Sequence, residues 1–198
     1  MNQFYLLIIN DEHKYRYAYK DASLLGIKKS VCNTCGRELS SWSFDGSHRL
    51  VSEGGAEYPD RLMFTGAGGP LFILSDTAVQ AFEKNGITGI SESSPIDILQ
   101  EEALPLTDAP PQYMLAQISG KIELDFKKMG LKKKKLCASC GRFEWNRQRL
   151  YPLFLNEETW DGSDFCKVES IPGYIICTNR VVQLVKEQKL KGFCFKAI

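Results

Sequence analysis

Two short stretches, Cys32-Asn33-Thr34-Cys35-Gly36 and Cys137-Ala138-Ser139-Cys140-Gly141, share one pattern: two cysteines separated by two residues and followed by glycine. This spacing lets both sulfurs of a turn face the same point, and the glycine tolerates the positive φ that such a turn often needs. The four thiolates together suit tetrahedral Zn²⁺. Two such stretches with the same trailing glycine therefore predict a metal centre made by Cys32, Cys35, Cys137 and Cys140.

The four cysteines could form one shared site or contribute to two separate sites. In the second case His13, His48 or Cys166 would have to complete the two ligand sets. Repeated sites should repeat their ligands, but His48 has no counterpart near the second pair, and Cys166 lies opposite Leu62. We therefore favour one structural Zn²⁺ per chain, since four thiolates leave no open position for catalysis.

A thioredoxin-like redox role is the main alternative chemistry for a Cys-x-x-Cys pair. That role places the first cysteine at a helix N-terminus, where the helix dipole lowers its pKa. Here lysine-rich, strand-like segments precede both pairs and aromatic residues follow them, which disfavours this role. Cys166, Cys177 and Cys194 have no partners in the repeated pattern, so we expect them to be small buried hydrophobic residues.

The sequence around the two cysteine pairs also repeats. The matching blocks are Phe4–Ile8 with Gln112–Ala116, Asp60–Phe64 with Asp164–Val168, and Phe72–Asp76 with Tyr174–Thr178. The blocks keep their order while the offset between them drifts from 108 to 102 positions. This drift is typical of an internal duplication with small insertions and deletions.

Each copy is predicted to hold several strands and one main helix. The expected strands are 3–9, one around Tyr15 to Tyr19, two that flank the turn within 29–44, 71–74 and 87–91 in the first copy, and 113–118, 121–126, 143–155 and 192–196 in the second. Residues 45–69 are expected to be mostly loop. The helices are expected to start at Ser75 or Asp76, where they bury Ala78, Val79 and Phe82, and at Thr178, where they bury Val181, Leu184 and Val185.

The expected fold is α+β: two tandem, pseudo-symmetric repeats of mostly antiparallel strands with one main helix each, joined by a zinc-ribbon-like Cys₄ centre. Residues 1–92 form the first repeat and 113–198 the second. Residues 93–112 carry four prolines and several acidic residues. They are predicted to be a connector with a short helical turn around 97–103. The whole is expected to form one compact unit.

Composition excludes several classes of protein. The chain has 198 residues, of which 43% are hydrophobic and 25% are charged, as in ordinary globular proteins. The formal net charge of +1 argues against a general nucleic-acid binder. The N-terminus lacks the features of a signal peptide, and no stretch suits a membrane span, so a cytoplasmic protein without membrane partners is expected.

A lysine run and the absence of catalytic motifs bear on the possible function. The run Lys132–Lys135 could contact phosphate or an acidic partner, but lysines also protect a solvated strand edge from pairing. No phosphate-binding glycine loop, nucleophile elbow or HExxH motif is present, so no catalytic site and no enzyme activity are expected.

The chain resembles the double-CxxCG motif family of bacterial immunity proteins, which belong to contact-dependent and polymorphic toxin systems of the swarm-inhibition type. The resemblance rests on the two CxxCG pairs about a hundred residues apart and on the blocks Ile87–Ile90 and Leu190–Phe193. It implies a cytoplasmic antidote that binds a cognate toxin protein, with Cys32, Cys35, Cys137 and Cys140 as the motif residues. The alternative function is a zinc-ribbon nucleic-acid-binding protein. The sequence leaves the oligomeric state and the toxin-binding surface open.

Overall fold

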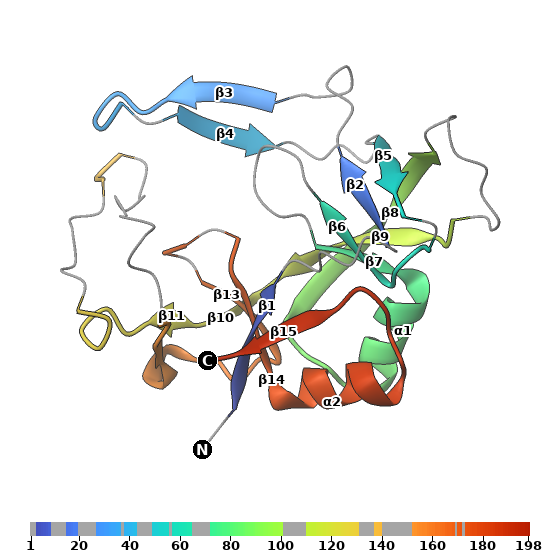
Figure 1. Cartoon of the computed structure of the whole chain (residues 1–198). Helices are drawn as coiled ribbons and strands as arrows, with labels where there is room; N and C mark the ends of the chain where they lie inside the picture. Colours follow the sequence, from blue (N-terminus) through green and yellow to red (C-terminus); the bar gives the residue numbers. More distant parts are fainter. Residues whose placement is uncertain are drawn as a thin grey trace.

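The computed structural model arranges its described residues in two groups of strands, two helices and a separate hairpin (Figure 1). The described residues are 3–8, 15–19, 27–36, 38–42, 49–55, 57–64, 72–100, 110–130, 137–139, 152–168, 170–171 and 173–198.

Six strands close into a barrel in the order β2-β5-β8-β9-β7-β6. Their bounds are β2 Arg16–Tyr19, β5 Arg49–Gly54, β6 Arg61–Phe64, β7 Phe72–Ser75, β8 Ile90–Gln100 and β9 Tyr113–Ile118. Neighbours are antiparallel except for β2 with β6 and β5 with β8, which are parallel. Apolar side chains at alternate positions fill the barrel, as expected for strands with one buried face. They are Leu62, Ile73, Ile96, Tyr113 and Leu115.

The second group is a five-stranded sheet in the order β10-β13-β14-β1-β15, which we call the open sheet. Its strands are β1 Phe4–Ile8, β10 Gly120–Lys121, β13 Phe165–Lys167, β14 Ile175–Thr178 and β15 Cys194–Ala197. A short antiparallel pair, β11 (Glu123–Leu124) and β12 (Leu155–Asn156), follows β10, and the 3₁₀ turn η3 (Glu157–Thr159) follows β12. The apolar cluster of this group includes Phe4, Leu6, Ile122, Cys166 and Ile176.

The first strand of each half of the chain pairs with the other half. β1 lies between β14 and β15, with Leu6 opposite Ile176 and Lys196. β9 lies between β7 and β8, with Leu115 opposite Ile73 and Ser94. The two halves are therefore joined by strand pairing and not only by the chain that connects them.

Helix α1 (Asp76–Lys84) directly follows β7, and α2 (Asn179–Glu187) directly follows β14. Ser75 is the N-cap of α1, because its side-chain oxygen accepts a hydrogen bond from the Ala78 N–H at 3.1 Å. Both helices end in backbone with positive φ, at Gly86 (62°) and at Lys189 (54°). This left-handed conformation is the usual helix terminator, and it favours glycine over lysine.

The bonds that end the two helices match one another when 103 is added to the residue numbers of the first. The matching N–H to carbonyl pairs are Asn85 to Ala81 with Gln188 to Leu184, and Ile87 to Phe82 with Leu190 to Val185. The strand–helix unit β7–α1 thus has the same backbone pattern as β14–α2.

At the start of each helix, one aspartate connects the helix to the opposite half of the chain. Each carboxylate accepts one bond from the hydroxyl before the helix and one from a backbone N–H of the other half. The pairs are Asp60 with Ser75 Oγ (2.7 Å) and Lys191 N–H (2.7 Å), and Asp164 with Thr178 Oγ1 (2.7 Å) and Thr88 N–H (3.1 Å).

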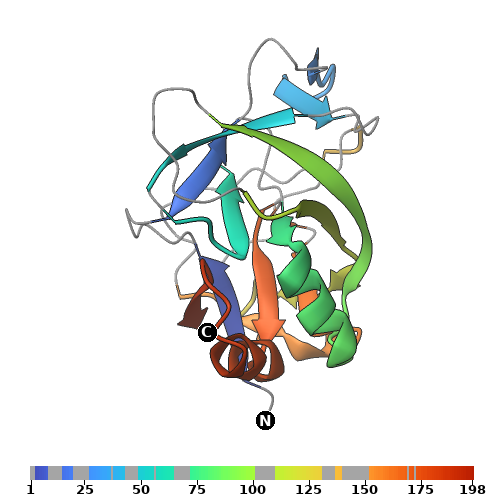
Figure 2. The ribbon, with the colours of Figure 1, turned by 90° about the vertical axis from the view of Figure 1, so that its right-hand side faces the viewer.

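The core between the halves combines aliphatic side chains with a small group of aromatic rings. Figure 2 shows α1 and α2 next to each other, and their buried faces share one apolar cluster. The Phe82 ring makes edge-on contacts with Phe165 at 5.3 Å and with Phe193 at 5.9 Å between centroids. At Gly89 an added Cβ would lie 2.0 Å from the Phe165 carbonyl oxygen, so only glycine permits this approach.

The α+β class, the mostly antiparallel strands and the two helices are confirmed. Of the two predicted caps, Ser75 and Asp76, the structure has Ser75, and the predicted buried residues of both helices are buried. The strand predicted at 113–118 is found with those bounds.

Three local predictions are wrong. The prediction that 45–69 is mostly loop is wrong for the described residues of this range, because most of them lie in β5 and β6. Residues 97–100 extend β8 instead of forming a helical turn; Pro95 suggested a connector, but at Pro95 β8 is paired on one side only, where proline is tolerated. The strand predicted at 121–126 is interrupted at Ile122 between β10 and β11. Residues 43–48, 65–71, 101–109 and 140–151, on which other predictions fall, lie outside the described residues.

Candidate metal centre

The hairpin of β3 (Ile27–Val31) and β4 (Glu38–Trp42) carries the first cysteine pair in its turn. The Gly36 N–H donates to the Cys32 carbonyl oxygen at 2.8 Å, which closes the turn. Gly36 has a φ of +69°, and an added Cβ would meet nothing within 4 Å. Backbone conformation, and not lack of space, therefore explains the glycine after the cysteine pair.

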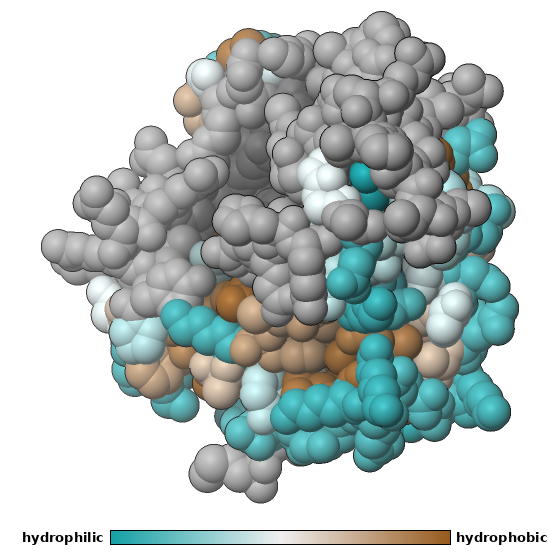
Figure 3. All heavy atoms as spheres, turned by 45° about the vertical axis from the view of Figure 1, so that its right-hand side comes forward, coloured by the Kyte–Doolittle hydropathy of each residue, from teal (hydrophilic) through white to brown (hydrophobic). Residues whose placement is uncertain are grey.

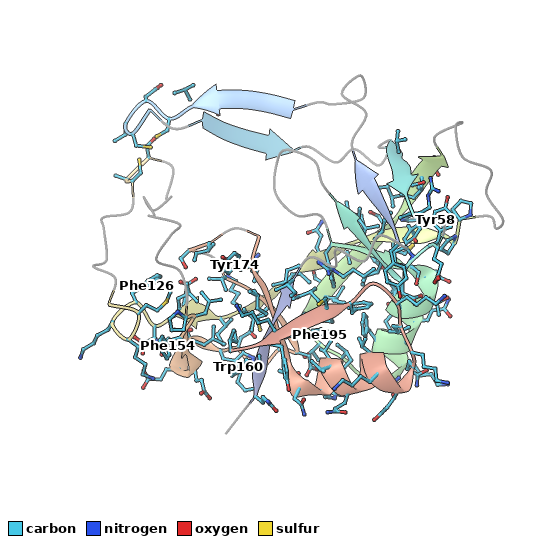
Figure 4. The ribbon with its side chains drawn as sticks, viewed as in Figure 1. Tyr58, Phe126, Phe154, Trp160, Tyr174 and Phe195 are labelled. Carbon is cyan, nitrogen blue, oxygen red and sulfur yellow. The ribbon has the colours of Figure 1, made fainter. Side chains whose placement is uncertain are left out.

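Three sulfur atoms meet at the end of this hairpin (Figure 4). The Sγ atoms of Cys32, Cys35 and Cys137 all lie within 4.8 Å of one another. The Cys32 and Cys137 sulfurs are 3.6 Å apart, too far for a disulfide, whose sulfurs are about 2 Å apart. Cys140, the fourth predicted ligand, lies outside the described residues.

The electrostatics at Cys32 favour a thiolate. Its pKa is lowered to about 6, chiefly because the Cys35 backbone N–H, and then that of Thr34, donate hydrogen bonds to its sulfur. Burial of Cys32, which is 4% exposed, opposes this shift. The thiolate is the form that ligates metal. Three converging sulfurs are a soft donor set and could hold a metal ion.

The other predicted residues are not part of this cluster. Cys166 and Cys177 are each 1% exposed, and Cys194 is partly buried in β15. Burial raises the pKa of Cys166 to about 12 and raises that of Cys177 as well. The prediction of small buried hydrophobic residues is thus confirmed for Cys166 and Cys177. His13 and His48 lie outside the described residues.

The charges are distributed unevenly along the chain, which the small net charge of the whole sequence does not reveal. Residues 1–112 carry 9 Lys and Arg against 15 Asp and Glu, whereas residues 113–198 carry 16 against 9. The halves therefore have formal net charges of −6 and +7, which nearly cancel in the total of +1. The small total charge is thus the sum of an acidic first part and a basic second part of the chain.

No protein-family model matches the chain, and no curated protein matches it. The resemblance to the double-CxxCG proteins thus remains an expectation from the motif. Within the ranges that the structure describes, no helix has the length and apolar character needed to cross a membrane.

Proposed function

We propose that this protein is a cytoplasmic immunity protein that binds and neutralises a cognate bacterial toxin, with a structural metal that clamps the two halves of the chain. The observation that carries the proposal is the convergence of Cys137 on Cys32 and Cys35, from 105 positions away. It supports the reading of the two CxxCG motifs as one unit, on which the family resemblance rests.

The metal is Zn²⁺, one per chain, with Cys140 as the fourth ligand. An all-sulfur donor set favours Zn²⁺ among the common divalent ions, and a closed set of four thiolates gives a structural site. Residues of both halves hold this metal, so it adds a cross-link between segments that strand pairing also joins. The protein acts by binding and not by catalysis.

We also infer that the chain arose by internal duplication and that its two halves are pseudo-symmetric repeats. The matched helix-ending bonds and the matched roles of Asp60 and Asp164 support this inference. Strand pairing places Tyr113 opposite Ser75 as it places Phe4 opposite Thr178, which gives an offset of 109 for the first strand.

A co-expression growth assay tests the function. The protein encoded immediately upstream in the source genome is expressed with and without this chain. Killing by that neighbour, and growth when this chain is added, is the expected result. A neighbour that is harmless, or that kills despite this chain, contradicts the proposal.

The metal site has its own test. Purified protein should contain one zinc per chain. Cys35→Ser and Cys140→Ser should each lower the free energy of unfolding, and the double variant should lose little more than either single one, because each dismantles the same site. Additive losses, or two metals per chain, would indicate separate sites.

A zinc-ribbon nucleic-acid binder is the second candidate, and the +7 charge of residues 113–198 favours it. Binding to a DNA or RNA duplex that weakens steeply between 50 and 200 mM salt would support it, because phosphate contacts release counterions. Absence of binding at low salt would exclude it.

A further inference from the structure

The open sheet repeats the strand order of the barrel. The series β15-β1-β14-β13 corresponds to β8-β9-β7-β6. β10 and β11, which Ile122 separates, together correspond to β2, and β12, which pairs with β11, corresponds to β5. Directions match as well: β10 runs parallel to β13 as β2 runs parallel to β6, and β12 is antiparallel to β11 as β5 is antiparallel to β2. In this comparison β12 occupies the place of β5.

The final pairing differs between the two groups. In the barrel β5 has a parallel neighbour on its second side, with Arg49–Ser52 opposite Asp97–Gln100. β12 pairs with β11 alone, and no other strand of the described ranges lies beside it. Since the Asp125 N–H donates to the Phe154 carbonyl at 2.7 Å, the backbone of Phe154 faces β11. The backbone of Leu155 therefore faces outward, because alternate residues of a strand bond on opposite sides.

The same edge carries an exposed aromatic side chain. Phe154 is 40% exposed, and besides Val31 no other large hydrophobic side chain of the described residues is as exposed. Phe154 lies at the end of the molecule that holds β11 and β12, far from Tyr58 at the opposite end (Figure 4). Leu155 packs against the apolar cluster of the open sheet and is only partly buried. An unpaired edge beside an apolar surface is suited to accept another strand.

A second apolar area serves as the comparison. Figure 3 shows a band of apolar side chains on the face that carries β15, bordered by hydrophilic ones. Phe195 belongs to β15, and its ring stacks on Phe193 and meets Tyr5 edge-on, so it is held within the protein itself. Phe154 has no ring contact among the described residues. The β12 edge therefore remains the stronger candidate.

Charge defines the chemistry of the partner. Lys127 and Lys128 are exposed in the turn that follows β11, and Lys132–Lys135 follow them in the sequence. Of Lys127 and Lys128, only Lys128 has a carboxylate partner among the described residues, Asp125 at 3.6 Å. On the other side of β12, Glu157 and Glu158 begin η3. The partner's acidic residues should thus lie toward Phe154, as Asp97 lies opposite Arg49 in the barrel.

We propose that the outer edge of β12, together with Phe154, binds an extended segment of a partner protein that carries apolar and acidic side chains and adds as a parallel strand. This inference rests on the proposed function in one respect: the partner is the toxin. The bound segment takes the position that Asp97–Gln100 holds beside β5.

The first test uses a synthetic peptide with the sequence of Ser94–Glu102, which contains the strand that β5 binds in the barrel. Added to the ¹⁵N-labelled full chain, it should shift the amide signals of Phe154–Asn156 and of Lys127 and Lys128 in a saturable way. A peptide with the acidic residues replaced by their amides should bind more weakly. Shifts absent from β12, or confined to other parts of the chain, would overturn the proposal.

A matched pair of variants sharpens this test. Phe154→Ser should weaken peptide binding about tenfold or more, since aromatic anchors carry much of the affinity of an interface. Val31→Ser, at the other exposed apolar residue, should leave binding unchanged. Both positions are exposed, so both variants should fold, and circular dichroism checks this. Equal effects of the two variants would contradict a docking site at β12.

The growth assay separates this inference from the proposed function. Loss of protection by the Phe154→Ser variant but not by the Val31→Ser variant supports both. Full protection by the Phe154→Ser variant overturns the docking site and leaves the immunity function standing. If the wild-type chain gives no protection, the immunity function fails, and peptide binding alone decides whether β12 is a docking edge.

Discussion

The barrel follows the same succession of strands as the open sheet together with the pair β11–β12, but the two successions end differently. In the barrel, β5 and β8 pair and leave no free edge. Next to the open sheet, β12 pairs with β11 alone among the described strands, and Phe154, which precedes β12, is exposed. One pairing thus separates a closed structural unit from one that presents an edge, and edges in soluble proteins are either protected or used.

The largest effect is expected in the core that both units share. Phe82→Ala removes a ring that contacts Phe165 and Phe193, and we expect it to lower the free energy of unfolding by about 3–5 kcal/mol. Val185, the matching position of α2, is smaller, so Val185→Ala should cost about 2 kcal/mol. Urea denaturation measures both. Equal losses would show that the two helices do not contribute through the contacts seen here.

The edge itself is tested by proline. Leu50 of β5 lies in a strand paired on both sides, so Leu50→Pro should cost about 3 kcal/mol or more. The backbone of Leu155 in β12 faces away from β11, toward a side where no described strand pairs, so Leu155→Pro should cost clearly less. Thermal unfolding of the two variants gives the comparison. A similar cost at Leu155 would mean that the outer side of β12 is already paired.

Replacement of Asp164, the more buried of the two aspartates at the helix starts, should lower the free energy of unfolding more than replacement of Asp60. Asp164 is 6% exposed, and besides its two matched bonds its carboxylate pairs with Arg180 at 3.0 Å. Removal of one partner from such a buried network costs about 3 kcal/mol, which is the loss expected for Asp164→Ala. Asp60, which is more exposed, should cost about 1–2 kcal/mol on conversion to alanine. Equal losses in urea denaturation would contradict this order.

The smallest predicted effect depends on pH. In the proposed duplication, Leu62 of the barrel cluster corresponds to Cys166 of the cluster of the open sheet. Burial raises the pKa of Cys166 from 9.0 to about 12, so the unfolded chain loses this proton first as the pH rises. The free energy of unfolding should therefore be intact below pH 9 and fall between pH 9 and 12. In the Cys166→Ala variant, the free energy of unfolding from urea denaturation should fall less between pH 8 and pH 10 than in the wild type. An equal fall in both proteins would assign the loss to other groups.

The sequence predicted best the features that neighbouring residues determine. The strand–helix units follow from apolar spacing and from the Ser75 cap, and the cysteine turn follows from spacing and Gly36. These elements depend mostly on interactions between residues close in the sequence, so a single stretch of sequence is enough to predict them.

Long-range pairing could not be predicted in the same way. The insertion of β1 between β14 and β15 depends on partners more than 160 positions away, and nothing in Phe4–Ile8 specifies them. Sequence similarity aligned Tyr5 with Tyr113. In the strand pairing, however, Phe4 lies opposite Thr178 as Tyr113 lies opposite Ser75, so Phe4 takes the position equivalent to Tyr113. Burial and not residue identity decides the register. β5 was missed because its neighbourhood is rich in glycine and serine, which are typical of loops.

The candidate site was predicted in part for the same reason. Cys32 and Cys35 are placed by a local turn, but the arrival of Cys137 depends on the whole fold. The charge split between the halves was readable in the sequence and was concealed by the small total. The β12 edge had no sequence signal, since an unpaired edge is defined by the absence of a neighbour in space.

Because the first strand, β1, pairs with strands of the second half, it must remain unpaired during most of the synthesis of the chain. The Tyr5 carbonyl and the Cys177 side chain meet in the fold although 172 positions separate them. At about 5–20 residues per second, β1 leaves the ribosome roughly 10–30 s before its partners exist. During that time Phe4, Leu6 and Leu7 have no sheet to enter, and Cys32 waits for Cys137. β1, an inner strand of the open sheet, is thus made long before both of its neighbours, β14 and β15, and it can pair with them only when synthesis of the chain is nearly complete.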